Sequence, residues 1–132
     1  MKLFLYTDGG SRGNPGPSAT GIVLKDESKK IVSAYGEFLG IQTNNFAEYS
    51  AIISGLKKAK ALGATEVDCL ADSKLVIEQL SGRWKVKHPA IQKLFVQAYN
   101  VASEFKKVTY KHIRREFNKE ADAEVNKILD AQ

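Results

Sequence analysis

Hydrophobic and polar positions along the first forty residues predict three strands. Short apolar or alternating runs bounded by turn residues are typical of strands. Such runs cover residues 1–6, 20–25 and 31–39, and the polar segment 26–30 separates the last two. Because the intervening segments are short, we expect these strands to form an antiparallel meander.

Helical spacing takes over in the remainder of the chain. Tyr49, Ile52, Ile53, Leu56 and Ala59 form an apolar stripe that predicts a helix ended by Gly63. The elements expected after it are a strand over 67–71, a helix over 73–80, a helix opened by Pro89 with a stripe that reaches Phe105, a strand over 107–113, and a helix over 118–131 with Asn118 as its N-cap.

The order of these elements predicts the fold class. Strands that helices separate usually pair in parallel through right-handed crossovers, whereas the first three strands form a meander. We therefore expect a mixed α/β sheet with helices on its faces. The 132 residues contain no repeat, low-complexity tract or linker, so we expect one domain over residues 1–132.

Composition indicates the cellular environment of the protein and the class of molecule that it binds. No apolar run is long enough to span a membrane, and the single cysteine, Cys69, excludes an internal disulfide, which favours a reducing, cytoplasmic environment. The net charge of +5 favours a polyanionic partner such as nucleic acid. A lysine-rich surface that serves solubility alone is the equal alternative, and we expect a monomer.

Four acids fall where a sheet of this kind places ligands. Asp8 and Asp72 follow predicted strands, and Glu48 and Asp122 lie in the first turns of predicted helices. Ligand sites in open α/β sheets lie beyond the carboxyl ends of the strands. Carboxylates that converge there repel one another unless cations lie between them. Two Mg²⁺-like ions held by carboxylates can activate water for phosphodiester hydrolysis.

Each acid also has a purely structural alternative. Glu48 could complete a capping box with Asn45, and Asp72 could cap the helix that follows it. Asp122 could offset a helix dipole, and Asp8 could form a turn with the glycines after it. Taken singly, caps are common, but these alternatives do not explain why all four acids could share one site.

Four segments together resemble ribonuclease H, type 1, over nearly the whole chain. They are YTDGGSRGNPGPSATG, TNNFAEYSAIISGL, ADSKLVIEQLSG and NKEADAEVNK, in the order of that family. Four motifs in order are far more specific than one. The resemblance implies a three-layer fold whose five-stranded mixed sheet has the order 3-2-1-4-5 between helices. It also implies cleavage of the RNA strand of RNA/DNA hybrids to 3′-hydroxyl and 5′-phosphate ends, with double-stranded RNA as a further candidate substrate.

The resemblance also implies a role for each acid toward two Mg²⁺ or Mn²⁺ ions. Asp8 would bridge both ions, and Glu48 would hold one of them near the scissile ribose. Asp72 would be a ligand that orients the attacking water. Asp122 would be a ligand of the second ion and would help the product leave.

Residues outside the acids are candidates for contact with nucleic acid. Glycines at 9, 10 and 13 would allow close approach of a strand. The resemblance assigns a minor-groove contact to Asn14, DNA-strand contacts to Asn44 and Asn45, and part of a DNA-phosphate pocket to Thr43. The full candidate set is Gly10, Ser11, Arg12, Asn14, Thr43, Asn44, Asn45, Trp84, Lys85 and Lys87.

The chain departs from the family pattern in two places. Only SGRWKVKHP stands where many members have a basic protrusion. Trp84, Lys85 and Lys87 are then either a remnant of that surface or a solvated linker with the tryptophan packed on the core. The Gly-rich loop that carries a histidine in many members is also missing. His112 lies ten residues before Asp122, and a structural role is the favoured alternative for it.

Other side chains near the last acid are auxiliary candidates. Arg114, Arg115 or Glu116 could act in place of the missing histidine loop, and Asn118 joins His112 and Arg115 as an auxiliary candidate.

Two other functions remain open at this point. One is a non-catalytic nucleic-acid-binding module on the same fold. The other is a different nuclease of the superfamily, such as a junction resolvase or a proofreading exonuclease. A nucleotide phosphate loop in GGSRGNPG is disfavoured, because the segment lacks the Gly-Lys-Ser/Thr ending.

Overall fold

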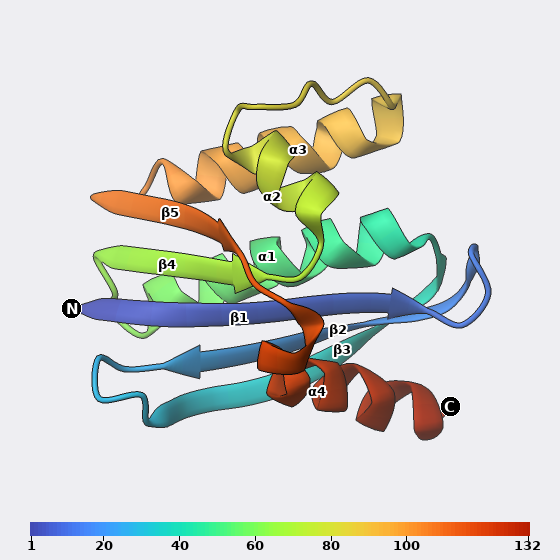
Figure 1. Cartoon of the computed structure of the whole chain (residues 1–132), viewed down its shortest axis with the longest axis horizontal. Helices are drawn as coiled ribbons and strands as arrows, with labels where there is room; N and C mark the ends of the chain where they lie inside the picture. Colours follow the sequence, from blue (N-terminus) through green and yellow to red (C-terminus); the bar gives the residue numbers. More distant parts are fainter.

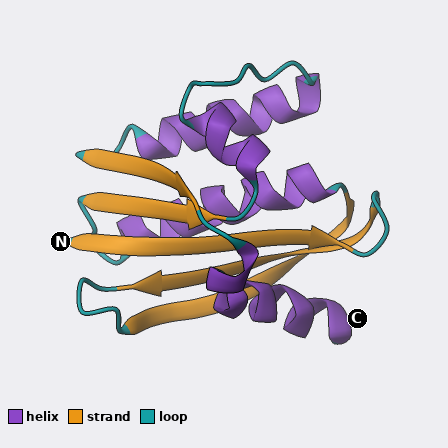
Figure 2. Cartoon of the chain, in the orientation of Figure 1, coloured by secondary structure: helices purple, strands orange, loops and turns teal.

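The computed structural model describes residues 1–132. Five strands form one sheet, and four α-helices cover its two faces (Figures 1 and 2). The elements are β1 (Lys2–Ser11), β2 (Gly16–Lys25), β3 (Ile31–Gln42), α1 (Asn44–Ala61), β4 (Glu66–Ala71), α2 (Lys74–Leu80), α3 (Pro89–Ala102), β5 (Lys107–His112), the short 3₁₀ helix η1 (Arg115–Phe117) and α4 (Lys119–Asp130).

The sheet has the order β3-β2-β1-β4-β5. The strands β1, β2 and β3 pair antiparallel, whereas β4 is parallel to both β1 and β5. This arrangement confirms the predicted mixed sheet and its 3-2-1-4-5 order. The helix α1 lies behind the sheet in Figure 1 and α4 in front of it, which makes three layers.

Two unequal cores hold these layers together. The larger core joins the sheet to α1 and α3 and includes Leu5, Ile52 and Leu94. The smaller one packs Val125 and Leu129 of α4 against the sheet. None of the helices combines the length and the hydropathy that crossing a bilayer would need.

The glycine-rich segment after Asp8 belongs to the β1–β2 hairpin, and the expected end of the first strand at residue 6 is wrong. β1 continues through Asp8 to Ser11, because Asp8 to Ser11 pair with Gly21 to Ser18 of β2. The parallel pairing with β4 ends earlier, at Thr7 and Ala71. Cross-strand pairing overrides the weak strand propensity of glycine here. Asp8 therefore lies inside β1, one residue past the end of the parallel ladder.

Two glycines allow the helices to approach the sheet beside Asp8. A Cβ atom on Gly9 would clash with the backbone of Ala47 in α1, and one on Gly21 would clash with the carbonyl of Ala121 in α4. The space beside Gly9 is thus required by α1, and the expected approach of nucleic acid to this glycine stays a prediction.

Candidate active site

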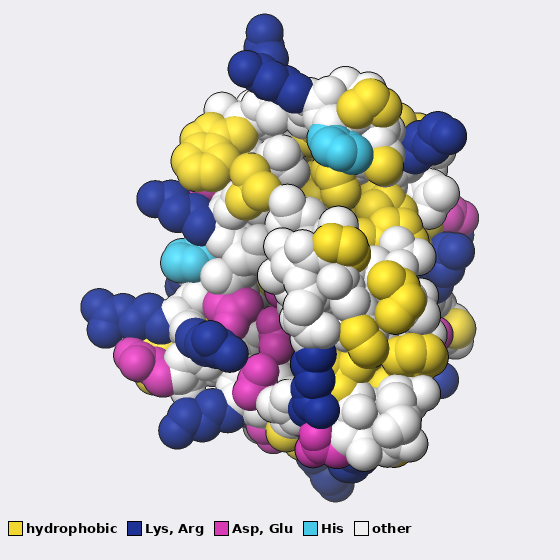
Figure 3. Space-filling model, turned by 90° about the vertical axis from the view of Figure 1, so that its right-hand side faces the viewer, with side chains coloured by type: hydrophobic (Ala, Val, Ile, Leu, Met, Phe, Trp, Pro, Cys, Tyr) yellow, Lys and Arg dark blue, Asp and Glu magenta, His cyan; other side chains and the backbone are white.

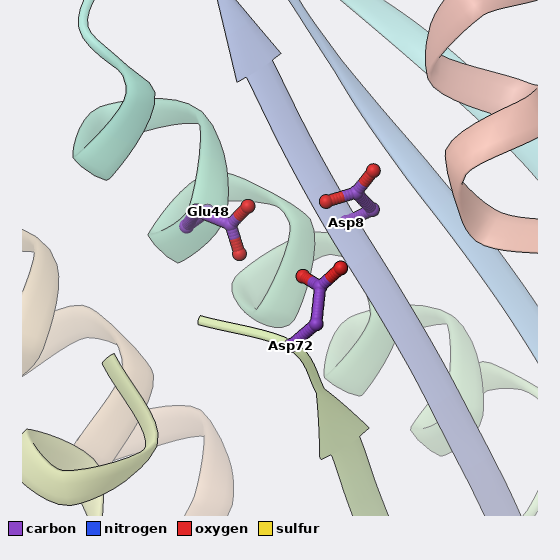
Figure 4. Close-up of side chains that lie close together, drawn as sticks. All are labelled: Asp8, Glu48 and Asp72. Carbon is purple, nitrogen blue, oxygen red and sulfur yellow. The ribbon is translucent and has the colours of Figure 1, made fainter. Parts of the chain in front are cut away.

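Three carboxylates from distant parts of the chain meet at the carboxyl end of the β1–β4 ladder (Figure 4). Asp8 extends from β1, Glu48 from the second turn of α1, and Asp72 from the residue after β4. One carboxylate oxygen of each lies within 4.8 Å of the others. This separation suits oxygen ligands around a shared divalent cation.

Glu48 is held by the strand that carries Asp8. Its Oε1 accepts a hydrogen bond from the backbone N–H of Gly9 at 3.0 Å. Its Oε2 is buried and has no hydrogen-bond partner. The capping box with Asn45 does not form, since the Thr43 hydroxyl caps α1 by accepting from the N–H of Phe46 at 3.2 Å. A buried carboxylate oxygen without a donor is costly, and a cation would satisfy it.

Asp72 does not cap α2 either. Ser73 is the N-cap, and its Oγ accepts from the N–H of Val76 at 3.4 Å. The turn alternative for Asp8 is likewise wrong, because Asp8 pairs with Gly21 within the β1–β2 ladder. Thr43 and Ser73 thus provide the caps that were considered for Glu48 and Asp72, and strand pairing takes the place of the turn considered for Asp8.

Asp122 faces the same cleft from the first turn of α4 but lies outside the three-acid cluster. The cleft has a volume of about 460 Å³ and is also lined by Arg115. Asn126, one helical turn beyond Asp122, donates a hydrogen bond from Nδ2 to Asp122 Oδ2 at 3.3 Å. Sequence reasoning missed Asn126, although its i, i+4 spacing to Asp122 was a readable signal.

The electrostatics of the cleft favour neutral or cation-bound carboxyl groups. Burial, followed by the charge of Asp72, raises the pKa of Asp8 to about 7. Burial, followed by the charge of Asp8, raises the pKa of Glu48 well above its usual range. Burial also raises the pKa of Asp72, which the Arg115 guanidinium opposes. A divalent cation would replace the protons, because it offsets the repulsion and supplies partners for the oxygens.

Several expected nucleic-acid contacts border this cleft. Gly10, Ser11, Arg12 and Asn44 line it directly. Acidic side chains gather on this end of the molecule with Lys and Arg side chains around them (Figure 3). Arg12 also forms an ion pair with Asp130 of α4 at 2.6 Å.

A second pocket next to the start of α1 contains other candidates. Asn14, Thr43 and Asn45 line it together with His88. His88 caps α3 by accepting a hydrogen bond at Nδ1 from the N–H of Ala90 at 3.2 Å. Asn14 Oδ1 accepts from the N–H of Asn44 at 3.0 Å and so holds the hairpin against α1.

The candidates in the connection between α2 and α3 do not line the acidic cleft. Residues 81–88 connect α2 to α3 without an extra helix, so the basic protrusion is absent. Trp84 is 46% exposed, which contradicts its packing in the core, and it lines a pocket with Lys85. Lys87 is exposed in the same connection. His112 is exposed at the end of β5 and does not line the acidic cleft, whereas Arg115 does.

Asn118 differs from its expected role. It occupies the N-cap position of α4, but its side chain makes no capping hydrogen bond. Its Nδ2 instead donates to the carbonyl of Thr7 in β1 at 2.8 Å. The prediction of the cap is correct in position and wrong in contact, because the amide is used across the fold.

The chain is similar to known proteins over nearly its whole length. A family model described as reverse transcriptase-like matches residues 6–128. The bifunctional protein Rv2228c of Mycobacterium tuberculosis is 48% identical over 132 residues, which cover 99% of this chain and 36% of that protein. Ribonuclease HI of Halobacterium salinarum is 39% identical over 129 residues, covering 98% of this chain and 65% of that protein. The chain thus spans about a third of the first relative and just under two thirds of the second.

Solved structures agree with these matches. The crystal structure of RNase H1 from Halobacterium salinarum superposes with a TM-score of 0.98 at 38% identity and covers 100% of both chains. LC11-RNase H1 in complex with an RNA/DNA hybrid superposes with a TM-score of 0.94 at 36% identity, covering 98% of this chain and 97% of that chain.

Proposed function

The chain belongs to the ribonuclease H family, type 1, and we propose that it hydrolyses the RNA strand of RNA/DNA hybrids with the help of divalent cations. The observation that carries the proposal is the cluster of Asp8, Glu48 and Asp72, with carboxylate oxygens within 4.8 Å. The unpartnered, buried Oε2 of Glu48 supports a cation at this place. A relative of the same fold that is seen with an RNA/DNA hybrid supports the substrate class.

The donor set fits two Mg²⁺ or Mn²⁺ ions. Asp8 would contact both ions, Glu48 and Asp72 would complete one coordination sphere, and Asp122 would complete the other. Such ions supply a water of lowered pKa and neutralise the charge that develops on the leaving oxygen. Hydrolysis by that water would leave 3′-hydroxyl and 5′-phosphate ends.

The chain's own residues would place the substrate. Asp72, which is half-buried at the rim, would orient the water, and Arg115 would attract the scissile phosphate into the cleft. Ser11 and Asn44 lie beside the acids and are linked by a hydrogen bond from the Ser11 N–H to Asn44 Oδ1 at 2.9 Å. Selection of RNA requires contacts to the 2′-hydroxyl, which both donates and accepts hydrogen bonds. Double-stranded RNA is a further candidate substrate on the same basis.

One cleavage assay tests the proposal. A single end-labelled strand is presented as RNA/DNA hybrid, double-stranded RNA, single-stranded RNA or double-stranded DNA, each with Mg²⁺, Mn²⁺ or chelator. We expect metal-dependent internal cuts in the RNA of the hybrid, lost in Asp8→Asn and retained in Glu27→Gln, which alters an exposed acid in the β2–β3 turn.

The other outcomes assign other functions. Binding of the hybrid without cuts in either metal would replace the enzyme with a binding module. Cuts in DNA alone would indicate another nuclease of the superfamily. Full activity of Asp8→Asn would remove the metal site from the mechanism. The monomeric state and the cytoplasmic location stay predictions.

A further inference from the structure

Asn118 makes a hydrogen bond that ties α4 to the strand carrying Asp8. Its side chain is 1% exposed, and its Nδ2 donates to the carbonyl of Thr7, the residue before Asp8, at 2.8 Å. An asparagine at an N-cap ordinarily uses its side-chain oxygen to accept from the first turn of its own helix. Asn118 makes no such bond. Its amide is therefore committed to β1 and not to the start of the helix.

The backbone of Asn118 extends this link to two residues of the cleft. Its carbonyl accepts from the N–H of Asp122 at 3.1 Å, and its own N–H donates to the carbonyl of Arg115 at 2.9 Å. A single residue thus joins the backbone next to Asp8 to the backbone of Asp122. Other polar contacts between the β1–β2 hairpin and α4 come from Arg12, which reaches Asn126 and Asp130 further along the helix, and from Lys25, which pairs with Glu120 at 2.6 Å.

The contact between Asn118 and Thr7 leaves buried polar atoms without partners, so it does not serve stability alone. Its Oδ1 is buried without a hydrogen-bond partner, and so is the Oγ1 of Thr7. Buried polar atoms without partners lower the stability of the folded state. Local inconsistencies of this kind are expected where function constrains the geometry.

We propose that Asn118 is a positioning residue that holds Asp122 at the distance from Asp8 that a shared second cation requires. The inference rests on the proposed function and assigns Asn118 to the site that this function uses. Residues behind a ligand typically change metal affinity or activity by about 10- to 100-fold when they are replaced. A similar loss is expected here, because α4 would lose its hydrogen-bonded link to β1 beside Asp8.

The first variant is Asn118→Ser, which separates positioning from folding. Serine is a good N-cap and supports the start of α4, but its hydroxyl is too short to reach the Thr7 carbonyl. We expect weaker binding of Mn²⁺ by calorimetry in the absence of nucleic acid, by about tenfold or more. On the hybrid, kcat falls by a similar factor, whereas KM stays within about twofold.

A double-mutant cycle identifies the residue through which Asn118 acts. Asn118→Ser is expected to weaken Mn²⁺ binding in the otherwise unchanged chain and to have no further effect in the Asp122→Asn background. The matched control is Gln79→Ala. This variant removes another buried amide, one that bonds the Tyr49 hydroxyl at 2.7 Å and does not line the acidic cleft. It should lower stability and leave Mn²⁺ affinity and kcat unchanged.

Each result decides the proposal. Unchanged Mn²⁺ affinity in folded Asn118→Ser, or an equal loss in the Asp122→Asn background, would overturn it. An equal loss in Gln79→Ala would also overturn it, because general destabilisation would then suffice. Asn118→Ala serves in the same cycle if the serine variant does not fold. If the unchanged chain binds Mn²⁺ but does not cut the hybrid, the proposed function fails, and the Mn²⁺ cycle still decides the role of Asn118.

Discussion

Removing the charge of Asp8 should stabilise the protein when no metal is bound. Asp8 is 8% exposed and lies against Glu48 and Asp72, and its pKa rises from 3.8 to about 7 in the folded state. A tenfold change in proton affinity corresponds to about 1.4 kcal/mol, so keeping Asp8 ionised in the fold at pH 8 costs roughly 4 kcal/mol. The acids share this repulsion, and we therefore expect Asp8→Asn to raise the free energy of unfolding by about 1–3 kcal/mol.

The sign of the pH dependence follows from the raised pKa. The folded state holds a proton on Asp8 up to about pH 7, whereas the unfolded chain releases it near 3.8. The contribution of Asp8 to the stability of the metal-free protein is therefore most favourable below the unfolded pKa and is lost as the pH rises through the folded pKa. Most of the difference between Asp8→Asn and the unchanged chain should disappear near pH 4.5, where Asp8 is already neutral in the fold.

Urea unfolding in chelator at pH 8 and at pH 4.5 measures this effect. The control is Glu27→Gln, which makes the same acid-to-amide change at an exposed position and should alter neither curve. Added Mg²⁺ should stabilise the unchanged chain and have little effect on Asp8→Asn. The reasoning is refuted if Asp8→Asn is no more stable at pH 8, or if its advantage is equal at both pH values.

Two further predictions concern the sheet and the rim of the cleft. Gly21→Ala should lower the free energy of unfolding by about 2–3 kcal/mol, because the new Cβ would clash with the Ala121 carbonyl. Thermal unfolding measures this loss, and an unchanged midpoint would show that α4 can move away freely. Arg115→Ala should raise KM for the hybrid by about three- to tenfold and reduce the salt slope of binding by about 0.9, as expected for one lost phosphate contact; an unchanged slope would place Arg115 outside the interface.

Local sequence patterns were sufficient to predict the order of the elements and the candidate acids. Apolar alternation and helical stripes predicted the order of the elements, and from that order came the mixed sheet. The motifs around Asp8, Glu48 and Asp72 identified the acids, because a motif of a few residues keeps a ligand and its supporting backbone together. The short connection around Trp84 was likewise readable as the absence of a protrusion.

Contacts between distant segments decided the rest. Pairing with β2 keeps Asp8 inside β1, where the sequence suggested that the strand had ended. The close approach of α1 explains Gly9, which sequence alone assigned to nucleic acid. The amide of Asn118 caps nothing and bonds Thr7, 111 residues away along the chain. A side-chain donor bonds the acceptor that lies nearest to it in the folded protein. Local sequence predicts only acceptors that are close along the chain, so contacts such as Asn118 with Thr7 depend on the tertiary structure.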